Sequence, residues 1–277
     1  MWFCYICIYN KTIIITMKTK LLLAAVFCAV NFLSASAVSP GLNDAYSRES
    51  FTDKAGTVLS YRMLKPEKIN PEEKYPLVVF LHGAGERGAD NESQLFHGGS
   101  GFSNPVNMTK YPAFVIFPQC PAGERWAEYN KQNSFNDNAE TPDESKNEKA
   151  IISLIEKLVT DYPIDTDRLY ITGLSMGGMG TFDLVCRHPD LFAAAIPICG
   201  AVNPTRLPAA KNVRFRIFHG ANDDTVPTIW SRKAYKALKD AGAEVEYIEF
   251  AGTPHDSWNP AFNRPDFLPW LFSQKKK

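Results

Sequence analysis

Short stretches that are apolar throughout recur along the chain, and amphipathic stretches lie between several of them. The apolar stretches are residues 77–81, 113–117, 169–172, 193–198, 213–218 and 245–250. Short, continuously apolar runs are typical of strands buried on both faces of a parallel sheet. Residues 56–64 alternate between apolar and polar side chains instead, which predicts one strand of an N-terminal hairpin with its turn near residues 53–56.

Three of the intervening stretches predict helices. In residues 150–162 the apolar side chains recur at helical spacing and share one face. Residues 175–187 directly follow the third apolar stretch, and residues 228–241 have Thr228 as a predicted N-cap and Gly242 as a predicted stop. This alternation predicts an α/β fold in which helices cover both faces of a mostly parallel sheet.

Two long polar segments rich in glycine or asparagine, residues 86–110 and 119–149, interrupt the pattern. Loops of this length in a compact domain usually carry function. The sequence contains no internal repeat and no linker that would divide it. We therefore expect one domain over residues 38–277, with two elaborate loops.

The first 37 residues have the character of a secretory signal. Lys18 and Lys20 precede an apolar stretch over residues 21–33, and Ala35-Ser36-Ala37 fits a cleavage site after Ala37. We therefore expect a secreted or periplasmic protein without stable membrane insertion, with Met17 as the true start and residues 1–16 as an extension. A membrane anchor is the alternative, since residues 2–15 are also apolar.

Composition excludes several classes of protein. The chain has 30 basic and 30 acidic residues, so it lacks the basic excess of a nucleic-acid-binding protein. Its 45% hydrophobic content is too high for a disordered chain. After the predicted cleavage only Cys120, Cys186 and Cys199 remain, which allows one disulfide at most and excludes a disulfide-based scaffold.

One motif carries recognisable chemistry. Gly173-x-Ser175-x-Gly177 lies between a predicted buried strand and a predicted helix, where glycines permit a sharp turn. A serine at this turn presents its hydroxyl above the carboxyl edge of the sheet, next to the positive end of the helix. Ser175 is therefore the candidate nucleophile.

A serine nucleophile needs a base, and the base needs an acid that orients it. In hydrolases with this serine turn, the acid and then the base follow the serine along the chain. Asp223 and Asp224 follow the fifth apolar stretch, and His255 follows the last one. These candidates lie at the same sheet edge as Ser175, which predicts a Ser-Asp-His triad.

The other four histidines have interpretations that fit structural roles better. His82 ends the first apolar stretch and would shape the loop beneath the oxyanion hole; His97 lies before the serine, out of order. His188 precedes a proline at a helix end, and His219 at a strand end is interpreted as a hydrogen-bonded core residue. This leaves His255 as the candidate base.

The oxyanion of the reaction requires backbone N–H donors. We expect the first from Met176 and the second from Ala84, with Gly83 as the alternative, in the glycine-rich segment after the first apolar stretch. Trp126 and Trp258 are candidate substrate contacts, although for Trp258 a bracing role beneath the His255 loop is the favoured interpretation.

Five segments together resemble known esterases: LHGAGERG, PQC…W, GLSMGG, HGANDDTVP and GTPHDSW. Over residues 50–272 the chain is similar to secreted α/β-hydrolase esterases, a group of feruloyl and acetyl-xylan esterases, polyhydroxybutyrate depolymerases and phospholipase/carboxylesterases, with a branch termed predicted peptidases. The resemblance implies the α/β-hydrolase fold. It also implies Asp223, rather than Asp224, as the acid beside Ser175 and His255.

By this resemblance the protein would hydrolyse carboxylic esters of acylated plant polysaccharides or their oligomers through an acyl-enzyme. The triad chemistry requires no cofactor and no metal, and the sequence contains no H-E-x-x-H motif. A phospholipase or general short-chain carboxylesterase is the first alternative. A serine peptidase and a non-catalytic glycan-binding protein follow.

Overall fold

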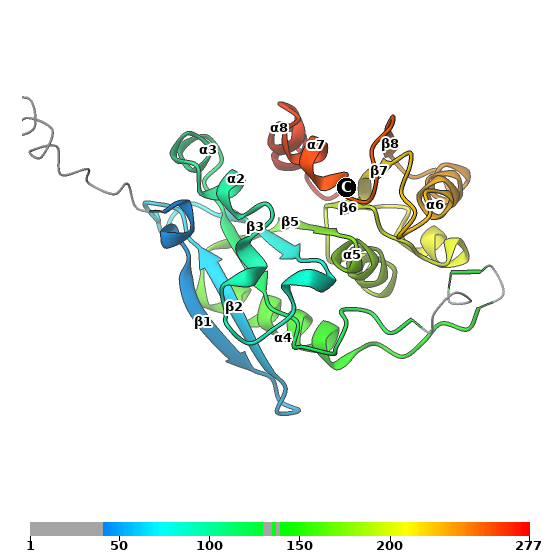
Figure 1. Cartoon of the computed structure of the whole chain (residues 1–277). Helices are drawn as coiled ribbons and strands as arrows, with labels where there is room; N and C mark the ends of the chain where they lie inside the picture. The colour runs from blue at the N-terminus through cyan, green and yellow to red at the C-terminus, as the bar shows by residue number, and fades with distance from the viewer. Residues whose placement is uncertain (1–40, 130–134, 137–138) are drawn as a thin grey trace, which may run out of the picture. The chain divides into compact units, whose positions relative to one another are not determined.

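A computed structural model describes residues 41–129, 135–136 and 139–277 (Figure 1). Residues Leu42–Lys277 form one compact unit. The predicted signal, its cleavage site and the extension before Met17 lie outside the described residues. Within the described part of the chain, no helix has both the length and the apolar character needed to cross a membrane.

The described strands join in one eight-stranded sheet with the order β1-β2-β4-β3-β5-β6-β7-β8. The strands are β1 (Ser47–Thr52), β2 (Val58–Leu64), β3 (Tyr75–Leu81), β4 (Phe114–Pro118), β5 (Ile164–Leu174), β6 (Ala194–Ile198), β7 (Arg214–Gly220) and β8 (Val245–Phe250). The β1–β2 and β2–β4 pairs are antiparallel, and the pairs from β4–β3 to β7–β8 are parallel. The six predicted buried stretches are thus all strands, and the mostly parallel sheet is confirmed.

Helices cover both faces of the sheet, as predicted. The longer helices are α4 (Lys146–Asp161), α5 (Met176–Arg187) and α6 (Ile229–Asp240), and the shorter ones are α2 (Gly99–Ser103), α3 (Pro105–Lys110), α7 (Trp258–Phe262) and α8 (Phe267–Phe272). In Figure 1, α5 lies on one side of the sheet and α7 and α8 on the other.

Two hydrophobic clusters fill the space between the sheet and these helices. One joins α4, α5 and α6 to the sheet through residues such as Leu154, Phe182 and Leu238. The other joins the opposite face to α2, α7 and α8 through residues such as Phe102 and Leu271. Because both faces are covered, the central strands are apolar throughout rather than alternating.

The predicted hairpin turn is confirmed at Asp53. Its carboxylate accepts the backbone N–H groups of Ala55 and Thr57, each at 2.8 Å, and Gly56 has a φ of +87°. The strand before the turn, β1, lies in a segment whose side chains are mostly exposed, and its backbone pairs with β2 at the edge of the sheet.

Two details at the ends of α6 show what local pattern can predict. Gly242 has a φ of +79° and ends the helix as expected. Thr228 is the N-cap residue of α6, as predicted, but its side chain does not cap a backbone N–H group; its hydroxyl donates to the Gly220 carbonyl at 2.7 Å instead. The side chain therefore ties the loop before α6 back to the end of β7.

Candidate active site

The candidate nucleophile lies at a strained turn between β5 and α5. Ser175 has φ 54° and ψ −115°, an uncommon conformation for a residue with a side chain. Its backbone N–H donates to the Ile198 carbonyl at 2.9 Å, which ties the turn to the end of β6. A Cβ added at Gly177 would lie 1.9 Å from the Leu81 carbonyl oxygen, so only glycine fits there.

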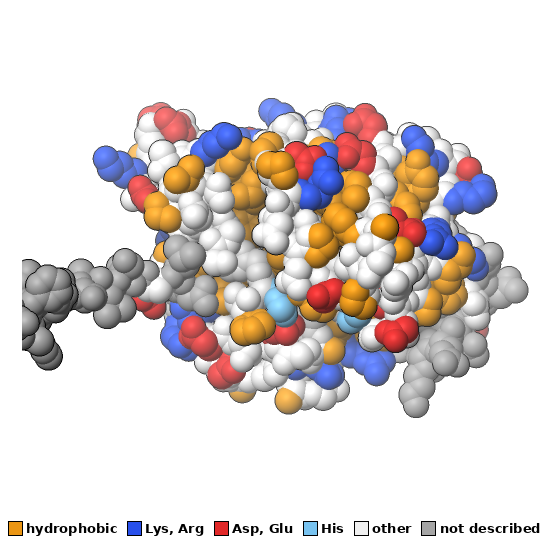
Figure 2. All heavy atoms as spheres, turned by 45° about the horizontal axis from the view of Figure 1, so that its top comes forward, with side chains coloured by type: hydrophobic (Ala, Val, Ile, Leu, Met, Phe, Trp, Pro, Cys, Tyr) orange, Lys and Arg blue, Asp and Glu red, His pale blue; other side chains and the backbone are white. Residues whose placement is uncertain are grey.

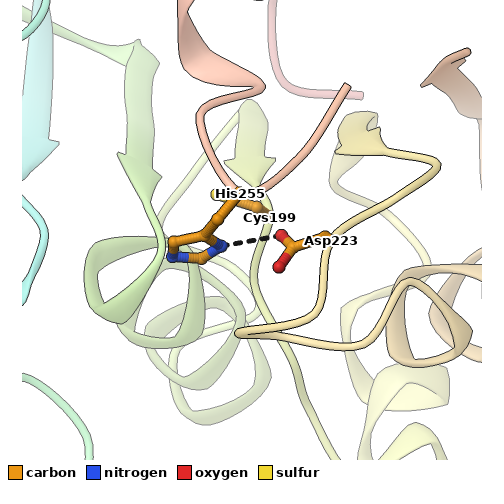
Figure 3. A group of neighbouring side chains, drawn as sticks. All are labelled: Cys199, Asp223 and His255. Atoms are coloured by element: carbon orange, nitrogen blue, oxygen red, sulfur yellow. Dashed lines mark hydrogen bonds and ion pairs between the residues drawn. The ribbon is translucent and has the colours of Figure 1, made fainter. Parts of the chain in front are cut away.

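The structure brings Ser175, His255 and Asp223 into one chain of hydrogen bonds. His255 lies after β8, and its Nε2 is 2.8 Å from the Ser175 Oγ. Its Nδ1 is 2.7 Å from the Asp223 Oδ2 (Figure 3). Because the carboxylate only accepts, Nδ1 carries the proton, and Nε2 is free to accept the serine proton.

The loop after β7 determines which aspartate faces the imidazole. The Asp223 side chain is fully buried, and its Oδ1 accepts the backbone N–H groups of Thr225 at 3.0 Å and Val226 at 2.8 Å. Asp224 is exposed, and its nearest described side-chain partner is the Thr225 hydroxyl at 3.4 Å. Only Asp223 therefore contacts His255.

The candidate oxyanion donors come from the two predicted segments. Met176 is the first residue of α5, where N–H groups have no acceptor within the helix, and Ala84 begins the short helix η2 (Ala84–Glu86). Beneath this loop, the His82 Nε2 accepts the Cys120 N–H at 2.9 Å and its Nδ1 donates to the Gly83 carbonyl at 2.6 Å. Burial lowers the pKa of His82 to about 4, so this imidazole is neutral.

The prediction that Trp126 contacts substrate is wrong. Its side chain is 0% exposed, which leaves no surface for stacking. Its indole N–H donates to the His82 carbonyl at 3.0 Å, and its ring packs edge-on against the His82 ring. Trp126 therefore supports the loop that carries Ala84, the candidate oxyanion donor. Sequence alone could not separate this role from a rim position, because both occur in long loops.

Trp258 packs against the candidate base. Its ring meets the His255 ring edge-to-face with centroids 5.5 Å apart, and His97 packs at 5.1 Å. This arrangement suits the bracing role, while substrate contact remains a prediction.

Three residues of the segment 86–110 were not predicted to belong to the site. Glu86 lies with one carboxylate oxygen 3.7 Å from the His97 Nε2, and Phe96 packs on His97 with its own side chain 78% exposed. Figure 2 shows histidine side chains that reach the surface among hydrophobic and acidic ones. In the sequence, the signals for these residues were the length of this segment and, for Glu86, its position just after the glycine-rich segment.

A small apolar cluster adjoins the site from the side of α5. It contains Met179, Ala201 and Val226, with Tyr129, Phe135 and Trp230 packed against them. The Met179 N–H donates to the Ser175 carbonyl at 3.0 Å, and the Val226 N–H donates to Asp223. The cluster therefore lies next to both the nucleophile turn and the acid.

Among the residues that the structure describes, one group of three side chains has the composition of a metal site: Cys199, Asp223 and His255 (Figure 3). Their ligand atoms lie within 4.8 Å of one another. However, the 2.7 Å hydrogen bond already joins two of these atoms, and burial raises the pKa of the Cys199 thiol to about 12. A protonated thiol is a poor metal ligand, so the group favours acid–base chemistry.

Sheet, serine turn and side-chain geometry together define an α/β-hydrolase fold with a serine-hydrolase arrangement of Ser, His and Asp. Comparison with known families identifies the family of serine hydrolases to which the chain belongs. Residues 67–264 match the phospholipase/carboxylesterase family, and the chain belongs to that family.

Related proteins are esterases and depolymerases. The chain is 30% identical to poly(3-hydroxyalkanoate) depolymerase C of Paucimonas lemoignei over 56% of this chain and 34% of that one. It is 27% identical to a probable acetylxylan esterase A of Aspergillus fumigatus, over 64% of this chain and 46% of that one. It therefore spans half or less of the length of these two relatives.

Solved structures agree on the fold. A thermostable esterase superposes with a TM-score of 0.78 at 38% identity, over 85% of this chain and 64% of that one. A ferulic acid esterase of Anaeromyces mucronatus superposes with a TM-score of 0.61 at 17% identity, over 83% of this chain and 90% of that one. At that identity the second match supports the fold alone.

Proposed function

We propose that this protein is a serine carboxylesterase that acts through an acyl-enzyme. The observation that carries the proposal is the continuous hydrogen-bond chain from the Ser175 Oγ through His255 to the buried Asp223. It lies at the carboxyl edge of a parallel sheet, where enzymes of this architecture bind their substrates.

In the proposed mechanism, the Ser175 Oγ attacks the ester carbonyl carbon while the His255 Nε2 takes the hydroxyl proton. Asp223 keeps Nδ1 protonated and stabilises the imidazolium that forms. The N–H groups of Met176 and Ala84 would bind the oxyanion of the tetrahedral intermediate. The imidazolium then protonates the leaving alcohol. In the second half, His255 activates water, which cleaves the acyl-enzyme.

We further propose that the substrate is an acylated plant polysaccharide or one of its oligomers, encountered outside the cytoplasm. Acetylxylan and feruloyl esterases among the relatives support this substrate class. The exposed ring of Phe96, joined to His255 through His97 and Trp258, supports it as well. Exposed aromatic rings next to a site can stack on a sugar or a phenolic group.

A general short-chain carboxylesterase or phospholipase is the second candidate. The match of residues 67–264 to the phospholipase/carboxylesterase family favours it.

The test is a substrate panel with the wild-type protein, Ser175→Ala and the exposed control Ser273→Ala. The panel contains p-nitrophenyl acetate, acetylated xylo-oligomers, methyl ferulate and a short-chain phospholipid. We expect Ser175→Ala to lose at least about 10³-fold in kcat, while Ser273→Ala keeps the wild-type rate. Equal rates in all three proteins would refute the esterase proposal. Preference for the phospholipid over the oligomers would support the second candidate.

A further inference from the structure

A second buried histidine contacts the candidate acid from behind. His219 lies near the end of β7, and its side chain is fully buried. Its Nε2 is 2.8 Å from the Val226 carbonyl oxygen and 3.2 Å from the Asp223 Oδ2. Its Nδ1 is 2.7 Å from the hydroxyl of Ser231 on α6.

These partners determine where the proton of the imidazole lies. A carbonyl oxygen only accepts, so Nε2 must carry the hydrogen, which it shares between Val226 and Asp223. Nδ1 then accepts from Ser231; the other acceptor near that hydroxyl, the Gly200 carbonyl, is farther away at 3.4 Å. Burial lowers the pKa of His219, so the ring is neutral near pH 7.

From these contacts we propose that His219 is a positioning residue, whose neutral Nε2–H, held by Ser231, orients Asp223 and sets the basicity of His255. The inference rests on the proposed function of the triad. It assigns Asp223 four N–H donors: backbone groups of Thr225 and Val226 on Oδ1, and the imidazoles of His255 and His219 on Oδ2.

The second imidazole donor has a defined electrostatic effect. A hydrogen bond disperses the negative charge of a carboxylate and so weakens its hold on a neighbouring imidazolium. Removing the His219 donor concentrates charge on the Asp223 Oδ2. The imidazolium form of His255 becomes more stable, and the pKa of His255 rises. Asp223 also loses the contact that fixes its side chain from behind.

The other charged and titratable groups near His219 and Asp223 are the same in the wild type and in the variants proposed below. Glu249 on β8 lies opposite His219 in the register and is paired with Arg232 of α6 and with the Tyr247 hydroxyl. Cys199 at the end of β6 has a raised pKa and stays a thiol.

The loops contribute the other neighbours. His97 reaches the base through the Trp258 ring. Asp224 and Asp256 adjoin the acid and the base in the chain.

Two amide substitutions test the two nitrogen atoms of the His219 imidazole separately. In His219→Gln the amide nitrogen stands at the place of Nε2 and can still donate to Asp223. In His219→Asn the amide reaches only the place of Nδ1, so contact with Ser231 is kept and the donor to Asp223 is lost. Both variants replace a neutral ring with a neutral amide, so each controls for the folding cost of the other.

The experiment follows the His255 ring by NMR across pH in the full chain and measures the pH profile of kcat/KM for p-nitrophenyl acetate. For His219→Asn we expect the His255 pKa and the acidic limb to rise by about half a unit to one unit. We also expect kcat to fall about three- to tenfold with KM unchanged. His219→Gln should remain close to wild type in both readouts. Ser231→Ala should also raise the acidic limb of the pH profile, by a smaller amount than His219→Asn.

Equal losses in the Asn and Gln variants, or an unshifted His255 titration in both His219→Asn and Ser231→Ala, would overturn the proposal. If His219→Asn does not fold, the comparison of the His255 titration in Ser231→Ala with that in wild type tests the proposal instead. The NMR titration needs no turnover, so a wild-type protein without esterase activity would refute the proposed function and leave this test intact.

Discussion

At the scale of single residues, the chemistry of the site depends on which polar groups are fixed by hydrogen bonds and which are exposed to solvent. Asp223 and Asp224 are neighbours of identical type, yet the first is buried with backbone donors on one oxygen and His255 on the other. The second is exposed to solvent. A carboxylate held in this way fixes the tautomer of the base, and an exposed one does not.

This difference predicts opposite outcomes for two equivalent substitutions. Asp223→Asn replaces an acceptor with a group that can present N–H to Nδ1, so His255 adopts the wrong tautomer and kcat should fall about 10³- to 10⁴-fold. Asp224→Asn should stay within about twofold of wild type, since it changes only an exposed charge. Steady-state kinetics on p-nitrophenyl acetate measure both. A large loss in Asp224→Asn alone would reassign the acid.

At the scale of elements, the turn from β5 into α5 determines where the nucleophile lies. Gly177 on α5 packs directly on the Leu81 carbonyl of β3, and a Cβ at Gly173 would lie 2.5 Å from the Gly177 oxygen. These close approaches of backbone to backbone hold Ser175 in its strained conformation.

Alanine at two glycines tests this packing. Gly177→Ala would require a shift of β3 or α5, and we expect a loss of about 3 kcal/mol or more in the free energy of unfolding. Gly101→Ala on α2 is the matched control, because a Cβ there meets nothing within 4 Å, and its effect should be neutral or slightly stabilising. Urea denaturation of both variants measures the difference; similar midpoints would contradict the packing argument.

Sequence pattern predicted elements well where burial is continuous and less well at their ends. The apolar stretch 169–172 indicated the core of β5, but the strand begins at Ile164, which pairs with Tyr75. Residues 165–168 then break the register with β3 before pairing resumes at Leu169, and their polar side chains are half-buried or exposed. The segment 86–110 was predicted as a loop, and it contains short helices. One of them, α2, is held by a residue far away in the chain, since the Tyr46 hydroxyl donates to the Gly99 carbonyl at 2.7 Å. Such contacts leave no local periodicity.

At the scale of the whole molecule, the topology brings distant segments to one sheet edge. Ser175, Asp223 and His255 each follow a parallel strand, which is why their order and location were predictable from sequence. The burial of Trp126 and the contact of His219 with Asp223 were not predictable from sequence, since both depend on how loops pack in three dimensions. Asp223 was preferred over Asp224 on motif resemblance alone.

Buried neutral histidines also make the whole fold acid-sensitive. Burial lowers the pKa of His82 to about 4 in the folded state, against 6.5 for an unperturbed histidine. Between these values the unfolded chain binds a proton that the folded chain does not, so stability falls as pH drops from about 6.5 to about 4. For His82 alone the loss is up to about 3 kcal/mol. Burial lowers the pKa of His97 and of His219 in the same direction.

Urea denaturation at pH 7 and pH 4.5 measures this loss. The variant His82→Asn keeps a donor toward Gly83 but has no group that titrates in this range, so its stability should depend less on pH than that of wild type. An identical pH dependence in the two proteins would show that His82 is not the source.

The central claim is that Ser175 is the nucleophile activated by His255, and covalent labelling tests it most directly. The full-length wild type, Ser175→Ala and His255→Ala are incubated with a fluorophosphonate, and the adduct is located by mass spectrometry of peptides. We predict one adduct per chain on Ser175, none on that peptide in Ser175→Ala, and labelling slowed by about 10³-fold or more in His255→Ala. An adduct on another residue, or ester hydrolysis without labelling of Ser175, would contradict the account.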